Sequence, residues 1–195
     1  MNLKDKIIDK LSPATNKLTE GEIFISDFLK SKNIKVQDQV KIGNLKNDSK
    51  FYRVADFYLP KYKVYIEYLG QWDKSEEANI RYKEKKQVYT KNNIPCIYLY
   101  SENLGIIEYI FDKRLKVELK KYNLKKELFS YRKKLFIDER GSVFLWFFLS
   151  VFILCTYNYH DKPKENFSFV TTFSLIILFQ LYRFIKGYKK HFLTD

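Results

Sequence analysis

The sequence predicts an α/β (α+β) domain built on a mixed sheet, followed by a transmembrane hairpin of two helices. Between residues 20 and 120, helical and strand periodicities follow one another in the order α-β-β-β-α-β-α, which is typical of mixed architectures. Towards the C-terminus two long runs carry no Asp, Glu, Lys or Arg, VFLWFFLSVFILCTYNYH at Val143–His160 and NFSFVTTFSLIILFQLY at Asn166–Tyr182. A chain that stays in water rarely places two such runs close together.

The composition of the chain excludes several classes of protein. Its 195 residues are 46% hydrophobic, so the chain is not wholly disordered, and 36 Lys and Arg against 23 Asp and Glu give a net charge of +13. Two Cys and two His exclude a disulfide scaffold, a four-Cys zinc site and a His-rich metal site. Divalent cations on carboxylates remain open. The first residues contain no apolar segment, so we expect no cleaved secretory signal.

Short periodic segments predict the elements of the domain. Thr19 and Glu22 fit a capping box before a helix that ends near Lys32, with Ile23, Phe24, Phe28 and Leu29 on its apolar face. Alternating or β-branched runs predict four strands, and charged periodic runs predict two later helices. The expected strands are Val36–Ile42, Phe51–Leu59, Val64–Leu69 and Ile94–Tyr100, and the expected helices are Glu76–Lys91, with Ile80, Tyr82 and Val88 inward, and Glu102–Leu119.

The two uncharged runs predict membrane spans. A spanning helix needs roughly 20 apolar residues, and the second run, extended to Ile185, approaches that length while the first is marginal. Basic residues flank the pair on both outer sides, so the positive-inside rule puts both termini in the cytoplasm. We therefore expect a protein of the cytoplasmic membrane with two spans. The alternative is a pair of buried core helices.

These features divide the chain into five parts. We expect an N-terminal segment (1–17), the mixed domain (18–120), a basic juxtamembrane helix or linker (121–141), the hairpin (142–186) and a basic cytoplasmic tail (187–195). The segment Lys113–Phe136 mixes leucines with many lysines, which is typical of a basic helix near an anionic leaflet. A solvated connecting helix is the alternative for this segment.

Two acidic residues fall within runs that should be buried strands, Asp56 in FYRVADFYLP and Glu67 in KVYIEYLG. A hairpin that turns between Lys61 and Tyr62 pairs residues whose numbers sum to 123, and Asp56 and Glu67 satisfy this sum. Opposed residues share one face of the sheet, and two carboxylates so close require a cation. Mg²⁺ or Mn²⁺ is the simplest candidate. Ion pairs with Arg53 or Lys63 are the alternative.

The strings GEIFISDFL, RVADFYLPKYKVYIEYLG and RYKEKKQVYTKNNIPCIYLY together resemble the core of PD-(D/E)XK nucleases. The segment Glu22–Lys120 is most similar to the compact branch related to very-short-patch repair endonucleases. The resemblance implies a restriction-endonuclease-like mixed sheet flanked by helices, with Asp56 and Glu67 as metal ligands. It also implies that the carbonyl of Tyr68 completes the coordination and that Glu22 supports the metal through water. A plain capping-box glutamate is the alternative for Glu22.

The chain departs from that family pattern at one position. The family's lysine commonly lies two residues after the Glu, where this chain has Leu69. Some members of the superfamily carry the lysine on the following helix, where Lys83 and Lys86 are available. We predict Lys86, because it shares a helical stripe with Tyr82 and Tyr89. Gln71 or Gln39 would be the polar partner otherwise.

The basic, aromatic surface predicts nucleic acid as the partner, DNA before RNA. Lys83 and Arg53 are candidates for phosphate contacts and Trp72 for base stacking, although a lysine-rich composition alone explains the same residues. The sequence thus favours a membrane-anchored, Mg²⁺-dependent endonuclease that hydrolyses phosphodiester bonds. The alternatives are a catalytically silent module that binds nucleic acid or a protein at the membrane, and an adaptor whose hairpin oligomerises. Whether the chain forms a homodimer is left open.

Overall fold

The computed structural model describes residues 18–156 and 163–193, and the chain divides into two compact units, Met1–Leu124 and Lys125–Asp195. Each unit is described by itself. The predicted N-terminal segment 1–17, most of the connector between the two uncharged runs (157–162) and the last two residues lie outside the described part. The boundary between the units falls a few residues after the predicted end of the mixed domain at residue 120.

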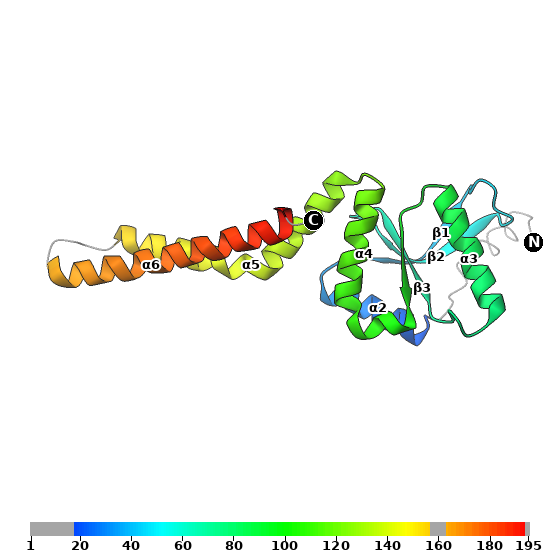
Figure 1. Cartoon of the computed structure of the whole chain (residues 1–195), viewed down its shortest axis with the longest axis horizontal. Helices are drawn as coiled ribbons and strands as arrows, with labels where there is room; N and C mark the ends of the chain where they lie inside the picture. Colours follow the sequence, from blue (N-terminus) through cyan, green and yellow to red (C-terminus); the bar gives the residue numbers. More distant parts are fainter. Residues whose placement is uncertain (1–17, 157–162, 194–195) are drawn as a thin grey trace, which may run out of the picture. The chain divides into compact units, whose positions relative to one another are not determined.

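The first unit confirms the predicted order of elements and the mixed sheet (Figure 1). Its four strands lie in the order β1-β2-β3-β4, with β2 antiparallel to both β1 and β3, and β4 parallel to β3. The elements are α2 (Glu20–Ser31), β1 (Gln37–Gly43), β2 (Tyr52–Leu59), β3 (Val64–Leu69), α3 (Glu76–Lys91), β4 (Cys96–Tyr100), the 3-10 helix η1 (Ser101–Ile106) and α4 (Ile107–Lys121). The last predicted helix therefore begins as a 3-10 helix and continues to Lys121.

Helix α2 begins with the predicted capping box. The Thr19 N–H donates to Glu22 Oε2 at 2.7 Å, and the Glu22 N–H donates to Thr19 Oγ1 at 3.4 Å. The predicted apolar face is partly wrong, because Ile25 and Leu29 are fully buried while Ile23 and Phe24 are 45% and 48% exposed. Helical periodicity alone allowed both faces, and packing on the sheet selected the one with Ile25.

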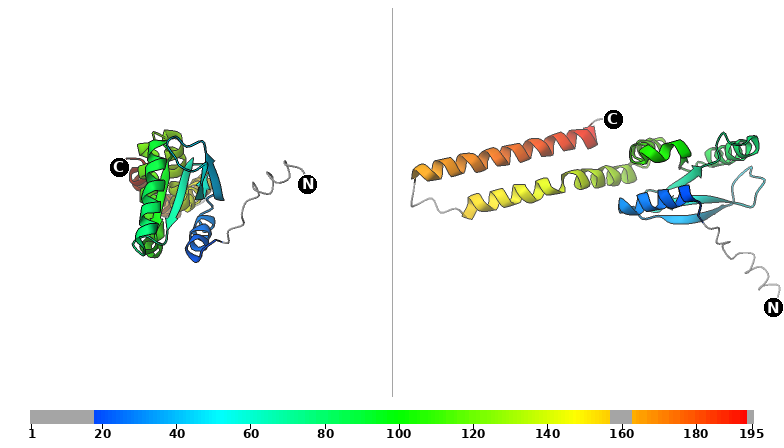
Figure 2. Two further views of the ribbon diagram at one scale, coloured as in Figure 1. Left: turned by 90° about the vertical axis from the view of Figure 1, so that its right-hand side faces the viewer. Right: turned by 90° about the horizontal axis from the view of Figure 1, so that it is seen from below.

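The two faces of the sheet are covered by different helices. Neighbouring residues of a strand point to opposite faces, and on β3 the Glu67 side chain meets α3 while the Tyr68 ring lies against α2. A Cβ atom on Gly21 of α2 would lie 2.3 Å from the Tyr68 ring. Helices α2 and α3 thus lie on opposite sides of the sheet (Figure 2).

Helix α3 is fixed on the sheet by two residues near its C-terminal end. Val88 and Tyr89 are buried and pack against Cys96 of β4. Ser75 caps the other end, where its hydroxyl accepts the Ala78 N–H at 3.1 Å. The prediction that Ile80 points inward is wrong, since Ile80 is 59% exposed. When Val88 and Tyr89 face the sheet, Ile80 lies on the side of α3 that faces solvent.

Arg53 of β2 joins the loop before it to α3. Its guanidinium donates to both Asp48 oxygens, at 2.7 Å and 2.6 Å, and also to Glu84 of α3. The side chains of Arg53 and Asp48 are at most 4% exposed, whereas Glu84 is 45% exposed. The hydrogen bonds from Arg53 hold the pKa of Asp48 below its ordinary value. The arginine therefore connects β2, its loop and α3 through one buried charge.

The second unit is a pair of helices, α5 (Lys125–Thr156) and α6 (Pro163–Tyr188), which pack on each other, followed by the π-helical turn Lys189–Leu193. The prediction of one basic helix over Lys113–Phe136 is wrong, because α4 ends at Lys121 and belongs to the first unit. The predicted basic tail (187–195) differs from the structure, because its described part makes contacts with α5. Glu139 of α5 accepts from Lys190 at 2.9 Å and pairs with His191 at 2.7 Å, so residues 189–193 pack on α5.

One stretch of the described residues, Val170–Leu193, is long and apolar enough to cross a membrane, by length and composition. Only 11% of its most apolar window is buried. The core helix of a soluble protein would be mostly buried, so the alternative of two buried core helices loses support here.

We predict that Arg53→Met lowers the free energy of unfolding of the first unit by about 3 kcal/mol, because it leaves the buried Asp48 carboxylate without its cation. Glu84→Gln should cost much less, since that partner is half exposed and solvent screens its charge. Urea unfolding can be followed by Trp72 fluorescence in the full chain carrying Trp146→Phe, which removes the second of the two tryptophans. Equal losses in both variants would contradict a buried Arg53–Asp48 pair.

Candidate active site

The candidate site lies where strands β2 and β3 separate. The paired residues of the hairpin are Phe57 with Ile66, Tyr58 with Tyr65, and Leu59 with Val64, which confirms the predicted register. The next position in the same register holds Asp56 and Glu67. At this position a side chain takes part in the strand pairing, because the backbone N–H of Tyr68 donates to Asp56 Oδ2 at 2.6 Å.

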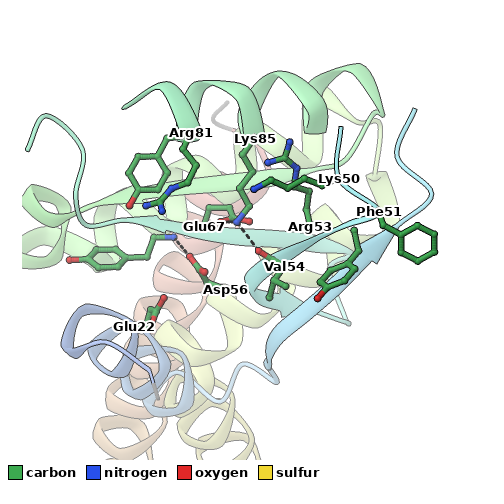
Figure 3. Close-up of a pocket in the computed structure, with 12 residues that line it drawn as sticks. Glu22, Lys50, Phe51, Arg53, Val54, Asp56, Glu67, Arg81 and Lys85 are labelled. Carbon is green, nitrogen blue, oxygen red and sulfur yellow. Dashed lines mark hydrogen bonds and ion pairs between the residues drawn. The ribbon is translucent and has the colours of Figure 1, made fainter. Parts of the chain in front are cut away.

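Both carboxylates line a hollow of about 660 Å³ on the first unit. Figure 3 shows Asp56 between Glu22 of α2 and Glu67, with Lys85 reaching down from α3. Basic and aromatic side chains form other parts of the lining, namely Lys50, Phe51, Tyr52, Arg53, Arg81 and Tyr82. Phe51 is 88% exposed. The hollow thus combines acidic groups with a basic and aromatic surround.

Lys85 is the lysine that reaches the carboxylates. Its Nζ lies 2.5 Å from Glu67 Oε2 and donates to the Val54 carbonyl at 2.7 Å. The other oxygen of Glu67, Oε1, accepts the hydroxyl of Tyr89 at 2.9 Å. Glu67 itself is 2% exposed. Two donors from α3 therefore hold the two oxygens of one buried carboxylate.

The prediction that Lys86 completes the site differs from the structure. The Lys86 Nζ lies 5.1 Å from the centroid of the Tyr98 ring and lines a separate hollow of about 520 Å³. Lys83 is exposed and does not line the first hollow. The reason is the rotation of α3, because Lys85 comes three residues before Val88 and four before Tyr89, the two residues that face the sheet.

Burial of like charges raises the pKa of both acids. Desolvation and, next, the Asp56 charge raise the pKa of Glu67 to about 8, although Lys85 and Tyr89 act in the other direction. Desolvation raises the pKa of Asp56 to about 6, against the lowering effects of Lys85 and of the Tyr68 N–H. Glu22 adds a smaller repulsion. With all three groups ionised, Asp56, Glu67 and Lys85 leave one uncompensated negative charge.

The residues of this site fit a divalent cation. Hard cations prefer oxygen ligands, and Mg²⁺ is often held by one or two carboxylates while it keeps several waters. Asp56 and Glu67 offer such carboxylates, and the remaining negative charge favours a cation. Within the described residues, no group of three or more His, Cys, Asp or Glu side chains is placed to hold a metal ion. Backbone oxygen, for which Tyr68 stays the prediction, and water would supply the other ligands.

Glu22 belongs to the capping box and also lines the same hollow, so a capping role and a role near the proposed metal are compatible.

The structure shows where the three residues predicted to contact nucleic acid lie. Trp72 packs on Tyr82 and Tyr100, with ring centroids 6.3 Å and 5.5 Å away. Lys83 is exposed, whereas Arg53 forms ion pairs with Asp48 and Glu84. Arg53 is therefore a structural residue at the wall of the hollow, and the prediction of a free phosphate contact does not hold for it.

Strand β1, the other neighbour of β2, has an unusual backbone conformation opposite Asp56. Asp38 pairs with Phe57 and Val40 with Ala55, so the register puts Gln39 opposite Asp56. Gln39 has φ of 49°, in the left-handed region that favours glycine. Residues in such conformations often cluster at functional sites. The distortion supports the view that this part of the sheet is shaped for more than strand pairing.

Comparisons with protein-family models, with curated proteins and with solved structures find no match to this chain. The assignment of a role to the site therefore depends on its residues and their geometry.

Lys85 was not predicted, and Tyr89 was expected on one helical stripe with Lys86. A signal for Lys85 was present, because Val88 was expected to face the sheet and Lys85 lies one turn before it. Lys85 and Tyr89 are also four residues apart, the spacing that puts two side chains on one helix face. The pattern K-x-x-x-Y of α3 would have predicted the pair.

We predict that, in EDTA, the free energy of unfolding of the first unit falls as the pH rises from about 5 to about 8. The folded unit holds protons on Asp56 and Glu67 that the unfolded chain releases, because both pKa values are raised, so rising pH favours the unfolded state. Urea titrations of the full chain at several pH values measure the slope. Glu67→Gln should remove the upper part of the decline, and an unchanged slope in that variant would contradict the assignment.

Proposed function

We propose that this protein is a membrane-anchored, metal-dependent nuclease that hydrolyses phosphodiester bonds in DNA. The observation that carries the proposal is the pair of opposed carboxylates, Asp56 and Glu67, in an open hollow with basic walls, with one lysine bound to Glu67. Proteins rarely bury two like charges unless a cation or a reaction requires them. Metal-assisted phosphodiester hydrolysis can use such groups, namely ligands for Mg²⁺ or Mn²⁺ and a fixed ammonium.

Each residue has a role in this proposal. A cation bound by Asp56 and Glu67 would lower the pKa of a bound water and neutralise charge on the phosphate. Lys85 lines the hollow and has one N–H beyond those donated to Glu67 and Val54, so its ammonium would orient the attacking water or stabilise the phosphorane oxygens. Arg81 and Lys50 line the hollow and would hold the phosphates of the strand. Tyr52 and Phe51 offer aromatic faces for bases.

The resemblance to PD-(D/E)XK nucleases supports the same proposal. The mixed four-stranded sheet with helices on both faces is compatible with a restriction-endonuclease-like fold. Leu69 stands where many members carry the lysine, and Lys85 supplies an ammonium to the same carboxylate from the following helix. We propose that Lys85 replaces that lysine. This position differs by one residue from the expected Lys86.

We also propose that the second unit anchors the protein as two spans with both termini in the cytoplasm. Val170–Leu193 has the length and apolarity of a span. The apolar half of α5 is shorter within the described residues, yet Leu145, Trp146, Phe148 and Phe152 are all at least half exposed. An exposed apolar surface of this extent aggregates in water unless lipid or protein covers it. Basic residues on the outer flanks give the orientation.

A silent binding module is the second candidate. It is favoured by the contacts of Lys85, which is already engaged by the Val54 carbonyl and by Glu67. In that case the ion pair would only stabilise the fold, and the basic walls would bind nucleic acid without cutting it.

We predict that the full chain in detergent cuts plasmid or single-stranded DNA with Mg²⁺ or Mn²⁺ and not with EDTA. Asp56→Asn and Glu67→Gln should abolish the cleavage, and Lys85→Met should slow it by about 100-fold or more, since a fixed charge near the phosphate is lost. Lys86→Met is the matched control, being the neighbouring lysine outside the hollow, and should cleave at the wild-type rate.

Two other results would contradict the nuclease. DNA retention without metal-dependent cleavage would select the silent module, and neither retention nor cleavage would select the adaptor. An effect of Lys86→Met equal to that of Lys85→Met would contradict the assignment of the lysine.

We predict that a cysteine introduced at position 162, as Lys162→Cys in a chain with Cys96→Ala and Cys155→Ser, reacts with a membrane-impermeant maleimide added to intact cells. The connector between two spans would lie outside the cytoplasm when both termini lie inside. A cysteine at Lys35, which lies in the first unit, is the control and should react only after lysis. Reaction of Lys162→Cys only after lysis would contradict two spans.

A further inference from the structure

The hydroxyl group of Tyr89 contacts the proposed metal ligand from a position that substrate cannot reach. Tyr89 is fully buried, and its hydroxyl lies 2.9 Å from Glu67 Oε1. Its ring packs beside Val88 and Cys96 in the contact between α3 and the sheet. The hydroxyl donates to Glu67, a contact that a phenylalanine ring at this position could not make.

The two hydrogen bonds of Glu67 constrain its carboxylate plane. Lys85 Nζ lies at Oε2 and Tyr89 Oη at Oε1. Since the two donors are one helical turn apart on α3, they act as a rigid pair, and the carboxylate cannot rotate without losing one of them. A carboxylate held in this way meets a cation with little loss of side-chain entropy.

We infer that Tyr89 is a positioning residue, which orients Glu67 for a divalent cation through its hydroxyl. The inference depends on the proposed function, because it assumes that Glu67 is a metal ligand. Tyr89 would not touch the cation, the water or the DNA. Its effect should therefore appear in the affinity for the metal before it appears in the affinity for DNA.

The test is direct Mn²⁺ binding, measured by electron paramagnetic resonance of the free ion with the full chain in detergent and without DNA. Tyr89→Phe keeps the ring and removes the donor, and the dissociation constant for Mn²⁺ should rise at least about 10-fold, as is usual when a partner of a metal ligand is removed. Tyr98→Phe is the matched control. Tyr98 is the register partner of Glu67 on β4, and its hydroxyl interacts with Cys96.

A second measurement separates positioning from stability. All binding is measured at a temperature well below the unfolding midpoint of each variant, where the folded form dominates. If cleavage is present, Tyr89→Phe should raise the Mg²⁺ concentration needed for half-maximal rate, while the KM for DNA stays unchanged. A purely structural role would lower the unfolding midpoint without either change.

The outcomes distinguish this inference from the proposed function. Weaker Mn²⁺ binding by Tyr89→Phe, with wild-type binding by Tyr98→Phe, supports the inference whether or not the wild-type chain cleaves DNA. Equal Mn²⁺ affinity in the wild type and in Tyr89→Phe overturns the inference alone. Absence of Mn²⁺ binding by the wild-type chain overturns the metal site of the proposed function, and the inference with it.

Discussion

The burial of Asp56 and Glu67 beside each other is the constraint on which the candidate site depends. Carboxylates removed from water repel each other strongly and must be matched by donors or cations. The fold supplies three: the Tyr68 N–H, the Lys85 ammonium and the Tyr89 hydroxyl. One ammonium does not balance two ionised carboxylates, so the fold holds protons on these acids unless a cation takes their place. A structure optimised only for stability would have placed apolar residues there.

Helix α3 carries most of this compensation, and its rotation decides which residues take part. Val88 and Tyr89 pack on β4, which turns Lys85 towards the carboxylates and Lys86 towards Tyr98. Arg53 of β2 also contacts the same helix through Glu84, while it pairs with Asp48. The structural and the proposed catalytic contacts of α3 are therefore coupled, and a shift of this helix would disturb both.

The second unit is held together by different interactions from those of the first. Its two helices pack through aromatic side chains, such as Phe136 and Phe184 with ring centroids 5.4 Å apart, and the ion pairs of Glu139 hold the turn Lys189–Leu193 on α5. Among the described residues, many of its other apolar side chains are exposed, a surface that lipid or another protein would cover. An anchor of this kind would confine the proposed nuclease to nucleic acid near the membrane.

The sequence by itself determined the order of elements, the hairpin register and the opposition of Asp56 and Glu67, because strand periodicity and a short Pro turn leave few alternatives. It also predicted the capping box and the uncharged C-terminal runs. It did not determine which face of α2 is buried, the choice between Lys85 and Lys86, or the partners of Arg53. Those depend on how a helix is rotated on the sheet, and neighbouring positions on a helix differ by only about 100°. Tertiary packing of Val88, Tyr89 and Ile25 decided them.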